Sequence, residues 1–124
     1  MRAVRGATTV QQDGRDEILD ATEELLAEMV RENGLREEQI VSVFFTTTPD
    51  LVACFPAEAA RRLGWVNTPL MGAAEIAVPG ALPRCIRVLI HANSGMEKED
   101  VSHVYLRDAA ALRPDLSRKG SERQ

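Results

Sequence analysis

Residues that commonly carry catalysis or bind metal ions are scarce in this sequence. Among 124 residues there are two cysteines, two histidines and one tyrosine. Cys54 and Cys85 lie far apart in the sequence and lack the spacing of a zinc site or a disulfide framework, so we expect both to be small buried residues. His91 and His103 fall near the ends of predicted strands, where a lone histidine is more often structural than catalytic. No residue is therefore an obvious candidate for acid–base or metal-assisted catalysis.

Motifs for nucleotides, membranes and nucleic acids are also missing. The sequence has no phosphate-binding loop, no dinucleotide-binding glycine pattern and no Gly-x-Ser-x-Gly nucleophile motif. No segment approaches the roughly 18 apolar residues that a membrane span requires, and the N-terminus lacks the apolar stretch of a signal peptide. A formal net charge of -4 and a pI near 5.2 disfavour binding to nucleic acid or to an anionic membrane. We expect a cytoplasmic protein with neither kind of partner.

The hydrophobic content is that of an ordinary folded domain. Hydrophobic residues make up 44% of the chain and charged residues 27%, which is enough apolar material for a packed core. At 124 residues the chain is long enough for one domain and too short for two. We expect a single domain over residues 1–124, in which the polar stretch from about 114 to 124 is a flexible tail.

Hydrophobic periodicity predicts one long helix, one short helix and about five strands. The long helix spans Arg15 to Asn33, with its apolar residues on one face. The short helix follows Pro56 and covers Ala57 to Leu63, before Gly64 ends it. The predicted strands are Arg2–Thr9, Ile40–Thr48, Pro69–Met71, Arg84–His91 and Ser102–Leu106.

These elements predict an α+β fold, a mixed five-stranded sheet with its helices packed on one face. Such an arrangement leaves the other face of the sheet uncovered. Because the strands carry hydrophobic residues on both sides, we expect the uncovered face to be buried against another subunit, which predicts a homo-oligomer.

Arginines occur at positions where a solubilising charge is not expected. Arg5 lies in the first strand, Arg87 lies in the middle of an apolar strand, and Arg113 directly precedes Pro114. A charge in a buried strand is costly unless it is paired. Arg87 has two interpretations: an internal ion pair with Glu75, or part of a pocket that binds an anion with several carboxylates.

Six short segments, in order along nearly the whole chain, resemble the monofunctional chorismate mutases of the trimeric, barrel-like α/β class. The segments are Val4–Thr9, Thr48–Leu51, Phe55–Ala57, Cys85–Val88, His103–Leu106 and Leu112–Leu116. The resemblance implies a homotrimer that forms a pseudo-α/β barrel with active sites at the subunit interfaces. It also implies the rearrangement of chorismate to prephenate in phenylalanine and tyrosine biosynthesis, without a cofactor or metal.

The resemblance also assigns roles to individual residues. Arg87 would stabilise charge on the ether oxygen, Arg5 and Tyr105 would bind substrate carboxylate, and Glu75 would accept a hydrogen bond from the ring hydroxyl. A second group would form the wall, the rim and the cover of the site: Phe55, Ala57, Arg61, Leu70, Met71, Gly72, Leu112 and Arg113.

Two positions depart from the family pattern. Glu58 stands where relatives have a lysine, which removes a positive charge from the entrance to the site, and Gly72 replaces a larger residue. Two other functions remain open at this point: a non-catalytic trimer that binds a dicarboxylate, and an enamine or imine deaminase on a similar trimeric fold. Glu75 and Tyr105 accompany Arg87, and this combination favours the mutase, because a simple carboxylate binder needs no acceptor for a hydroxyl group.

Overall fold

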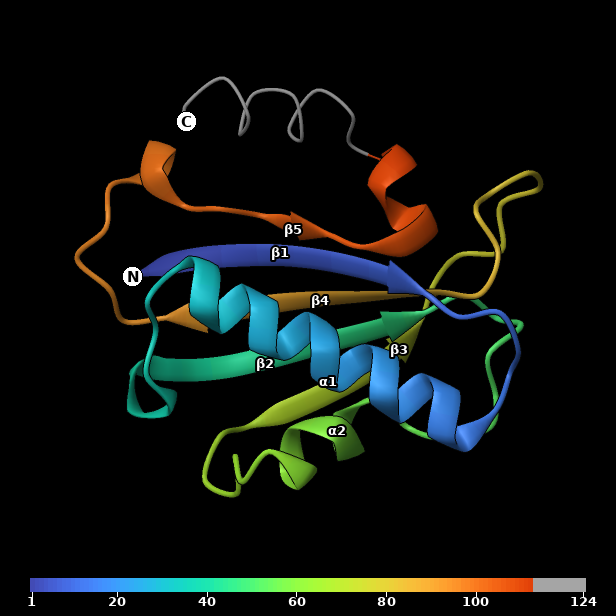
Figure 1. The fold of residues 1–124 in the computed structure, drawn as a ribbon, viewed down its shortest axis with the longest axis horizontal. Helices are drawn as coiled ribbons and strands as arrows, with labels where there is room; N and C mark the ends of the chain where they lie inside the picture. Colours follow the sequence, from blue (N-terminus) through green and yellow to red (C-terminus); the bar gives the residue numbers. More distant parts are fainter. Residues whose placement is uncertain (113–124) are drawn as a thin grey trace.

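A five-stranded sheet forms the centre of the structure, a computed structural model that describes residues 1–112 (Figure 1). The strands are β1 (Arg2–Thr9), β2 (Ile40–Thr47), β3 (Leu70–Ala74), β4 (Cys85–Ala92) and β5 (Val104–Tyr105). The strand order is β3-β2-β4-β1-β5. β4 is antiparallel to both of its neighbours, whereas the β1–β5 and β2–β3 pairs are parallel. The mixed sheet and its two helices confirm the predicted α+β architecture.

Both helices lie on one face of the sheet (Figure 1). The long helix, α1 (Arg15–Glu32), has two acidic residues in its first turn, where they complement the helix dipole. The chain leaves α1 through Gly34, whose φ of +58° is a conformation that glycine adopts without strain. The short helix, α2 (Ala57–Arg62), follows Pro56 and packs against α1 and β3.

The main hydrophobic core fills the space between α1 and the sheet. Leu25, Leu26 and Met29 of α1 pack in one cluster with Phe45 of β2 and Ile90 of β4, and all five are at most 1% exposed. Full burial of each such side chain contributes about 1.5–3 kcal/mol of transfer free energy. This face of the sheet is therefore fixed against α1. The opposite face is covered at one end by the cluster of Ala7, Cys85 and Ala109, and the rest of it is available for other contacts.

Gly6 permits the close approach of α1 to β1, which carries Arg5. A Cβ atom at position 6 would lie 2.5 Å from Met29 Sδ and 3.0 Å from Leu25 Cδ1. We expect Gly6→Ala to lower the free energy of unfolding by about 1–3 kcal/mol, because the extra carbon overpacks a full core. Thermal unfolding at a fixed protein concentration measures the effect. Gly95→Ala is the matched control, since a Cβ there meets nothing within 4 Å, and an equal loss in both variants would contradict the prediction.

The uncovered face of the sheet carries exposed apolar residues, as the sequence predicted. Phe44 of β2 is 40% exposed and Met71 of β3 is 62% exposed. They lie on the same face as Arg87, because Phe44 pairs directly with both Met71 and Leu89, and Leu89 is two residues from Arg87 on β4. Apolar surface of this kind marks an interaction site.

The predicted boundaries of both helices and of the three long strands are correct to within about one residue. The other two strands differ from prediction. β3 extends to Ala74 because its small residues pair with β2, although they have no alternating hydrophobic pattern. β5 is shorter than predicted, and a 3-10 helix that the sequence did not predict, η3 (Arg107–Leu112), follows it.

Two shorter 3-10 helices, η1 (Glu37–Gln39) and η2 (Lys98–Asp100), lie in connecting segments. No helix within residues 1–112 is long and apolar enough to cross a membrane.

Of the two cysteines, Cys85 is buried as predicted, but Cys54 is only partly buried. The predicted flexible tail lies outside the described residues.

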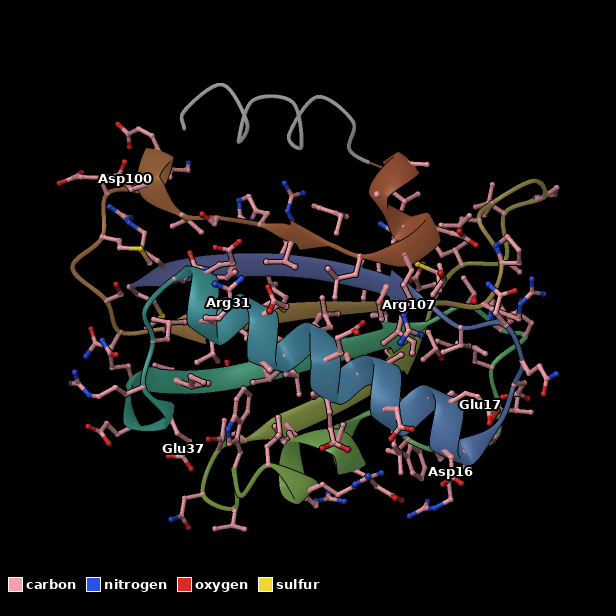
Figure 2. All side chains as sticks on the ribbon, in the orientation of Figure 1. Asp16, Glu17, Arg31, Glu37, Asp100 and Arg107 are labelled. Carbon is pink, nitrogen blue, oxygen red and sulfur yellow. The ribbon has the colours of Figure 1, made fainter. Side chains whose placement is uncertain are left out.

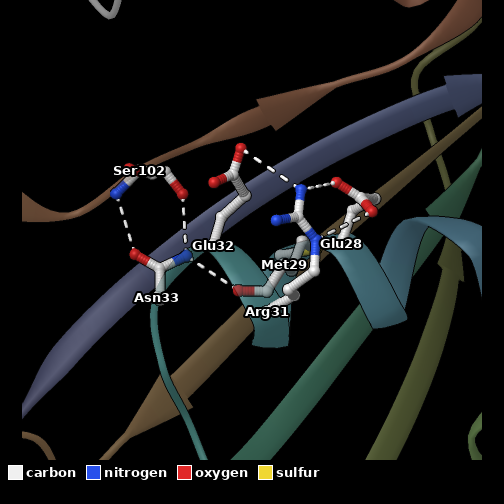
Figure 3. A network of polar contacts seen from close by, with 6 residues as sticks. All are labelled: Glu28, Met29, Arg31, Glu32, Asn33 and Ser102. Carbon is white, nitrogen blue, oxygen red and sulfur yellow. Dashed lines mark hydrogen bonds and ion pairs between the residues drawn. The ribbon is translucent and has the colours of Figure 1, made fainter. Parts of the chain in front are cut away.

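The segment that leads into β5 is tied to the end of α1. The Asn33 side chain accepts a hydrogen bond from the Ser102 backbone N–H at 2.8 Å and donates to the Ser102 carbonyl at 2.9 Å (Figure 3). At the other end of β5, Arg107 bridges to α1 through an ion pair with Glu24 at 3.4 Å, and Figure 2 shows it between η3 and the helix. These contacts fix a two-residue strand that has few ladder hydrogen bonds of its own.

Candidate active site

Arg87 lies on the uncovered face of the sheet. Its neighbours in the chain, Ile86 and Val88, are 0% and 3% exposed in the core, so the alternation of the strand directs Arg87 away from α1. Its side chain is 52% exposed. Within a single chain, Arg87 therefore carries little desolvation cost, although it lies in the middle of the sheet. Its guanidinium points outwards.

Glu75 holds the guanidinium of Arg87. It follows β3 directly, and its backbone N–H donates to the Thr47 carbonyl at 2.8 Å. Its Oε2 atom accepts a hydrogen bond from Thr46 Oγ1 at 2.6 Å and lies 3.2 Å from Arg87 Nε. The ion pair predicted for Arg87 is thus present. It engages one of the five N–H donors of the guanidinium, so it is compatible with the other interpretation, in which the remaining donors bind an anion.

Tyr105 lies in the same row of the sheet as Arg87. Ala7 of β1 pairs with Arg87 on one side and with Tyr105 on the other. Ala7 therefore separates the two residues in this row, and its side chain is buried at 1% exposure. Tyr105 and Leu112 both pack on the small cluster formed by Ala7, Cys85 and Ala109, so η3 brings Leu112 to this end of the face.

Arg5 lies next to this row on β1, opposite Leu89 of β4, and is exposed. Its backbone N–H donates to His103 Nδ1 at 3.0 Å. The imidazole thus extends the β1–β5 ladder by one acceptor beyond the two residues of β5. His91, on the same face, contacts Ser42 Oγ at 3.3 Å and packs edge-on against the Phe44 ring. Both histidines make structural contacts, in agreement with the sequence.

The thiol of Cys85 shares the face of Arg87. Burial raises the pKa of this thiol, and the opposing effect of the Arg87 charge is smaller. The group is therefore a neutral thiol at physiological pH and places no anion beside the guanidinium. Within residues 1–112 no three histidine, cysteine, aspartate or glutamate side chains are grouped as metal ligands would be.

Three other predicted site residues, Phe55, Ala57 and Arg61, lie in or beside the helix layer. α2 belongs to the helix layer, because Ala59 and Ala60 are buried in the core with α1, and this layer covers the opposite face of the sheet from Arg87. Phe55 precedes α2 and is 74% exposed, and Ala57 packs against the same core. Within one chain, the structure therefore does not bring Phe55, Ala57 and Arg61 to the row of Arg87.

Arg61 instead borders a separate hollow of about 230 Å³ beside β3. Trp65 and Thr68 form part of this hollow and were not among the predicted site residues. Both are buried in the loop between α2 and β3, and their burial depends on the tertiary structure. Met71 lies on the uncovered face. The residues that line the hollow are Arg61, Trp65, Val66, Thr68 and Leu70.

The two departures from the family pattern have simple surroundings. Glu58 forms an ion pair with Arg15 at 2.7 Å, which joins the starts of the two helices and compensates the negative charge. At Gly72, an added Cβ would meet only the Phe45 carbonyl at 3.8 Å, so the missing side chain leaves open space. Arg113 lies outside the described residues.

Comparison with known proteins identifies the family. The model for "chorismate mutase type I" matches residues 1–116. Chorismate mutase AroH of Thermus thermophilus is 50% identical over 117 residues, which cover 94% of this chain and 96% of the relative. Chorismate mutase AroH of Bacillus subtilis is 42% identical over 118 residues, which cover 94% and 93%.

The fold agrees with a solved structure of the same family. A chorismate mutase from Clostridium thermocellum superposes with a TM-score of 0.89 at 52% sequence identity, covering 90% of this chain and all of that one. Sequence and fold therefore agree. Both favour a chorismate mutase over the two alternatives, a deaminase and a non-catalytic dicarboxylate binder. The chain belongs to the type I chorismate mutase family.

Proposed function

We propose that Arg87 is the main catalytic residue of this chorismate mutase and that it acts by electrostatic stabilisation. The enzyme is an isomerase of aromatic amino acid biosynthesis that converts chorismate into prephenate. In this rearrangement the ether C–O bond breaks while a C–C bond forms within one molecule. The observation that carries the proposal is the partly exposed guanidinium of Arg87, fixed by Glu75 at 3.2 Å on an open sheet face.

The reaction makes few demands on the protein. No proton passes to the enzyme and no covalent intermediate forms, so binding must hold the enolpyruvyl side chain over the ring and place positive charge where negative charge develops. As the C–O bond lengthens, the ether oxygen becomes more negative. A guanidinium at that oxygen binds the transition state more tightly than the substrate, and this difference lowers the barrier.

The neighbours of Arg87 supply the remaining contacts in this proposal. Arg5 and Tyr105 bind the substrate carboxylates, because a guanidinium and a phenol both donate hydrogen bonds to carboxylate oxygens. Glu75 both orients Arg87 and accepts a hydrogen bond from the ring hydroxyl of the substrate. Leu112 covers this end of the site, and Arg113 adds a cation from the segment that follows.

The complete site requires a second copy of the chain. Phe55 and Arg61 lie in or beside the helix layer, and the row of Arg87 lies on the opposite face of the sheet. We propose a homotrimer in which the uncovered face of one subunit meets the Phe55–Arg61 side of the next. In support, apolar side chains are exposed on both parts, including Phe44 and Phe55 at 40% and 74%. The chorismate site then lies between subunits.

A cytoplasmic location is part of the same proposal. Both cysteines within the described residues are free thiols, which suits a reducing compartment.

The absence of proton transfer predicts a flat pH profile. With chorismate as substrate, the loss of its enol-ether absorbance measures the rate, and analysis of the product identifies prephenate. We expect kcat to vary less than about twofold between pH 6.5 and 8.5, because no group needs to exchange a proton during the rearrangement. Cys85 stays neutral throughout this range, since burial raises its pKa. A bell-shaped profile with a steep limb in this range would contradict the proposed mechanism.

A further inference from the structure

Arg84 adopts a backbone conformation that is uncommon for its residue type. Its φ is +50°, in the left-handed region that residues other than glycine, asparagine and aspartate rarely adopt. Arg84 immediately precedes β4 and lies three positions before Arg87. The direction in which β4 starts is therefore set at a strained residue, and such residues persist only when their surroundings hold them.

Asp50 is the residue that holds Arg84 from the side of β2. Its Oδ2 atom accepts a hydrogen bond from the Arg84 backbone N–H at 2.9 Å, and its Oδ1 atom accepts one from Thr48 Oγ1. Thr48 Oγ1 in turn accepts the Cys85 N–H at 2.9 Å, and the Thr48 N–H donates to the Cys85 carbonyl at 3.0 Å. One carboxylate thus connects the segment that follows β2 to Arg84, the residue before β4.

The end of β1 completes the arrangement. The Val10 N–H donates to the Arg84 carbonyl at 3.1 Å, and Arg84 Nε donates to the Val10 carbonyl at 3.2 Å. Arg84 is therefore held by segments that follow both neighbours of β4 in the sheet.

We propose that Asp50 is a positioning residue for Arg87, which it aligns by holding Arg84 in the left-handed conformation. Successive residues of a strand point to opposite faces, so a shift of one residue at the start of β4 would turn Arg87 towards α1. A smaller rotation would move the guanidinium away from the ether oxygen. The inference rests on the catalytic role proposed for Arg87.

The charge state of Asp50 suits this role. Burial acts to raise the pKa of its carboxyl, but the hydrogen bonds from Thr48 and from the Arg84 backbone outweigh this effect and lower the pKa. Asp50 is consequently an ionised acceptor at neutral pH. Hydrogen bonds to a charged acceptor are stronger than those between neutral groups.

The variant Asp50→Ala tests the proposal. We expect kcat to fall at least about tenfold while KM changes less than about twofold, because Arg87 acts in the transition state and the carboxylate-binding residues stay in place. Asp50→Asn, which retains one acceptor oxygen, changes the packing least, and we expect a smaller fall in kcat in the same direction. Rates are measured well below the unfolding temperature, so that a loss of stability alone leaves kcat unchanged.

A second substitution examines whether Asp50 acts through Arg84. Asparagine tolerates the left-handed conformation, so Arg84→Asn in the Asp50→Ala background should raise kcat at least about threefold. Glu38→Ala is the matched control, because it removes an exposed carboxylate paired with Arg36, near the opposite end of β4 from Arg84, and it should leave kcat unchanged.

Two results would overturn the positioning role. One is a normal kcat in folded Asp50→Ala and Asp50→Asn proteins, and the other is a loss of kcat that Arg84→Asn does not reverse. The catalytic role of Arg87 is tested independently by Arg87→Lys. If Arg87→Lys is inactive and the Asp50 variants are normal, only the positioning role fails; if Arg87→Lys is active, the proposed mechanism itself fails.

Discussion

Arg87→Lys will lower kcat at least about a hundredfold and leave the subunit assembly unchanged. Loss of one donor that stabilises developing negative charge has an effect of this size in other enzymes. Lysine keeps the charge, but its compact ammonium group cannot pair with Glu75 and reach the ether oxygen with the geometry of a planar guanidinium. Initial rates with chorismate and the native mass from light scattering provide the two measurements.

The fold offers a matched control for this substitution. Arg62 on α2 resembles Arg87 in exposure, 47% against 52% for the side chain, and pairs with Glu23 at 2.9 Å. It belongs to no part of the proposed site, so Arg62→Lys should keep normal activity. Near-normal kcat in the Arg87→Lys protein would contradict the catalytic role. Arg87 would then be a structural residue that pairs with Glu75.

Two inactive variants will regain activity when their subunits are mixed. Arg87→Lys disables one part of the site, and the double variant Phe55→Ala, Arg61→Ala disables the other. If the parts come from adjacent subunits, random assembly at equal amounts forms an intact site wherever an undamaged part of each kind meets. We expect about a quarter of the wild-type sites to be active, since each part is intact with a probability of one half.

The experiment refolds both variants together from denaturant so that the subunits assort at random. Each variant refolded alone is the control and should stay inactive. Mixing the folded proteins without denaturation should give less activity, because the subunits then exchange slowly. Absence of recovery after joint refolding, with the native mass of a trimer, would place the whole site within one subunit and contradict the interface proposal.

The elements of this fold were predictable where the side-chain pattern is strong. The β-branched residues of β2 and β4 and the apolar stripe of α1 identified these elements to within about one residue. β3 was underestimated because Gly72, Ala73 and Ala74 have little preference for a strand and are ordered by pairing with β2. η3 begins at the left-handed Arg107, whose conformation depends on tertiary contacts that local sequence does not encode.

The ion pair of Arg87 and Glu75 was predictable from the sequence, and the arrangement of the other candidate residues was not. An arginine in an apolar strand needs a partner, and the sequence offered Glu75; the structure places Glu75 Oε2 3.2 Å from Arg87 Nε. The separation of Phe55 and Arg61 from that pair depends on which face of the sheet each helix covers, and strand periodicity alone does not determine this. The role of Asp50 also depends on tertiary structure, since Asp50 and Arg84 are distant in the sequence and meet only when β2 and β4 are adjacent.

Because Ala7 pairs with both Arg87 and Tyr105, the strand spacing of the sheet fixes the distance between their backbones. Neighbouring strands are about 4.8 Å apart, so backbones that carry the guanidinium and the phenol are separated by two such steps, or about 10 Å. Main-chain hydrogen bonds set this interval, and the identity of the side chains around it has little influence. The side chains around this interval can therefore differ among relatives while the span between the two backbones stays constant.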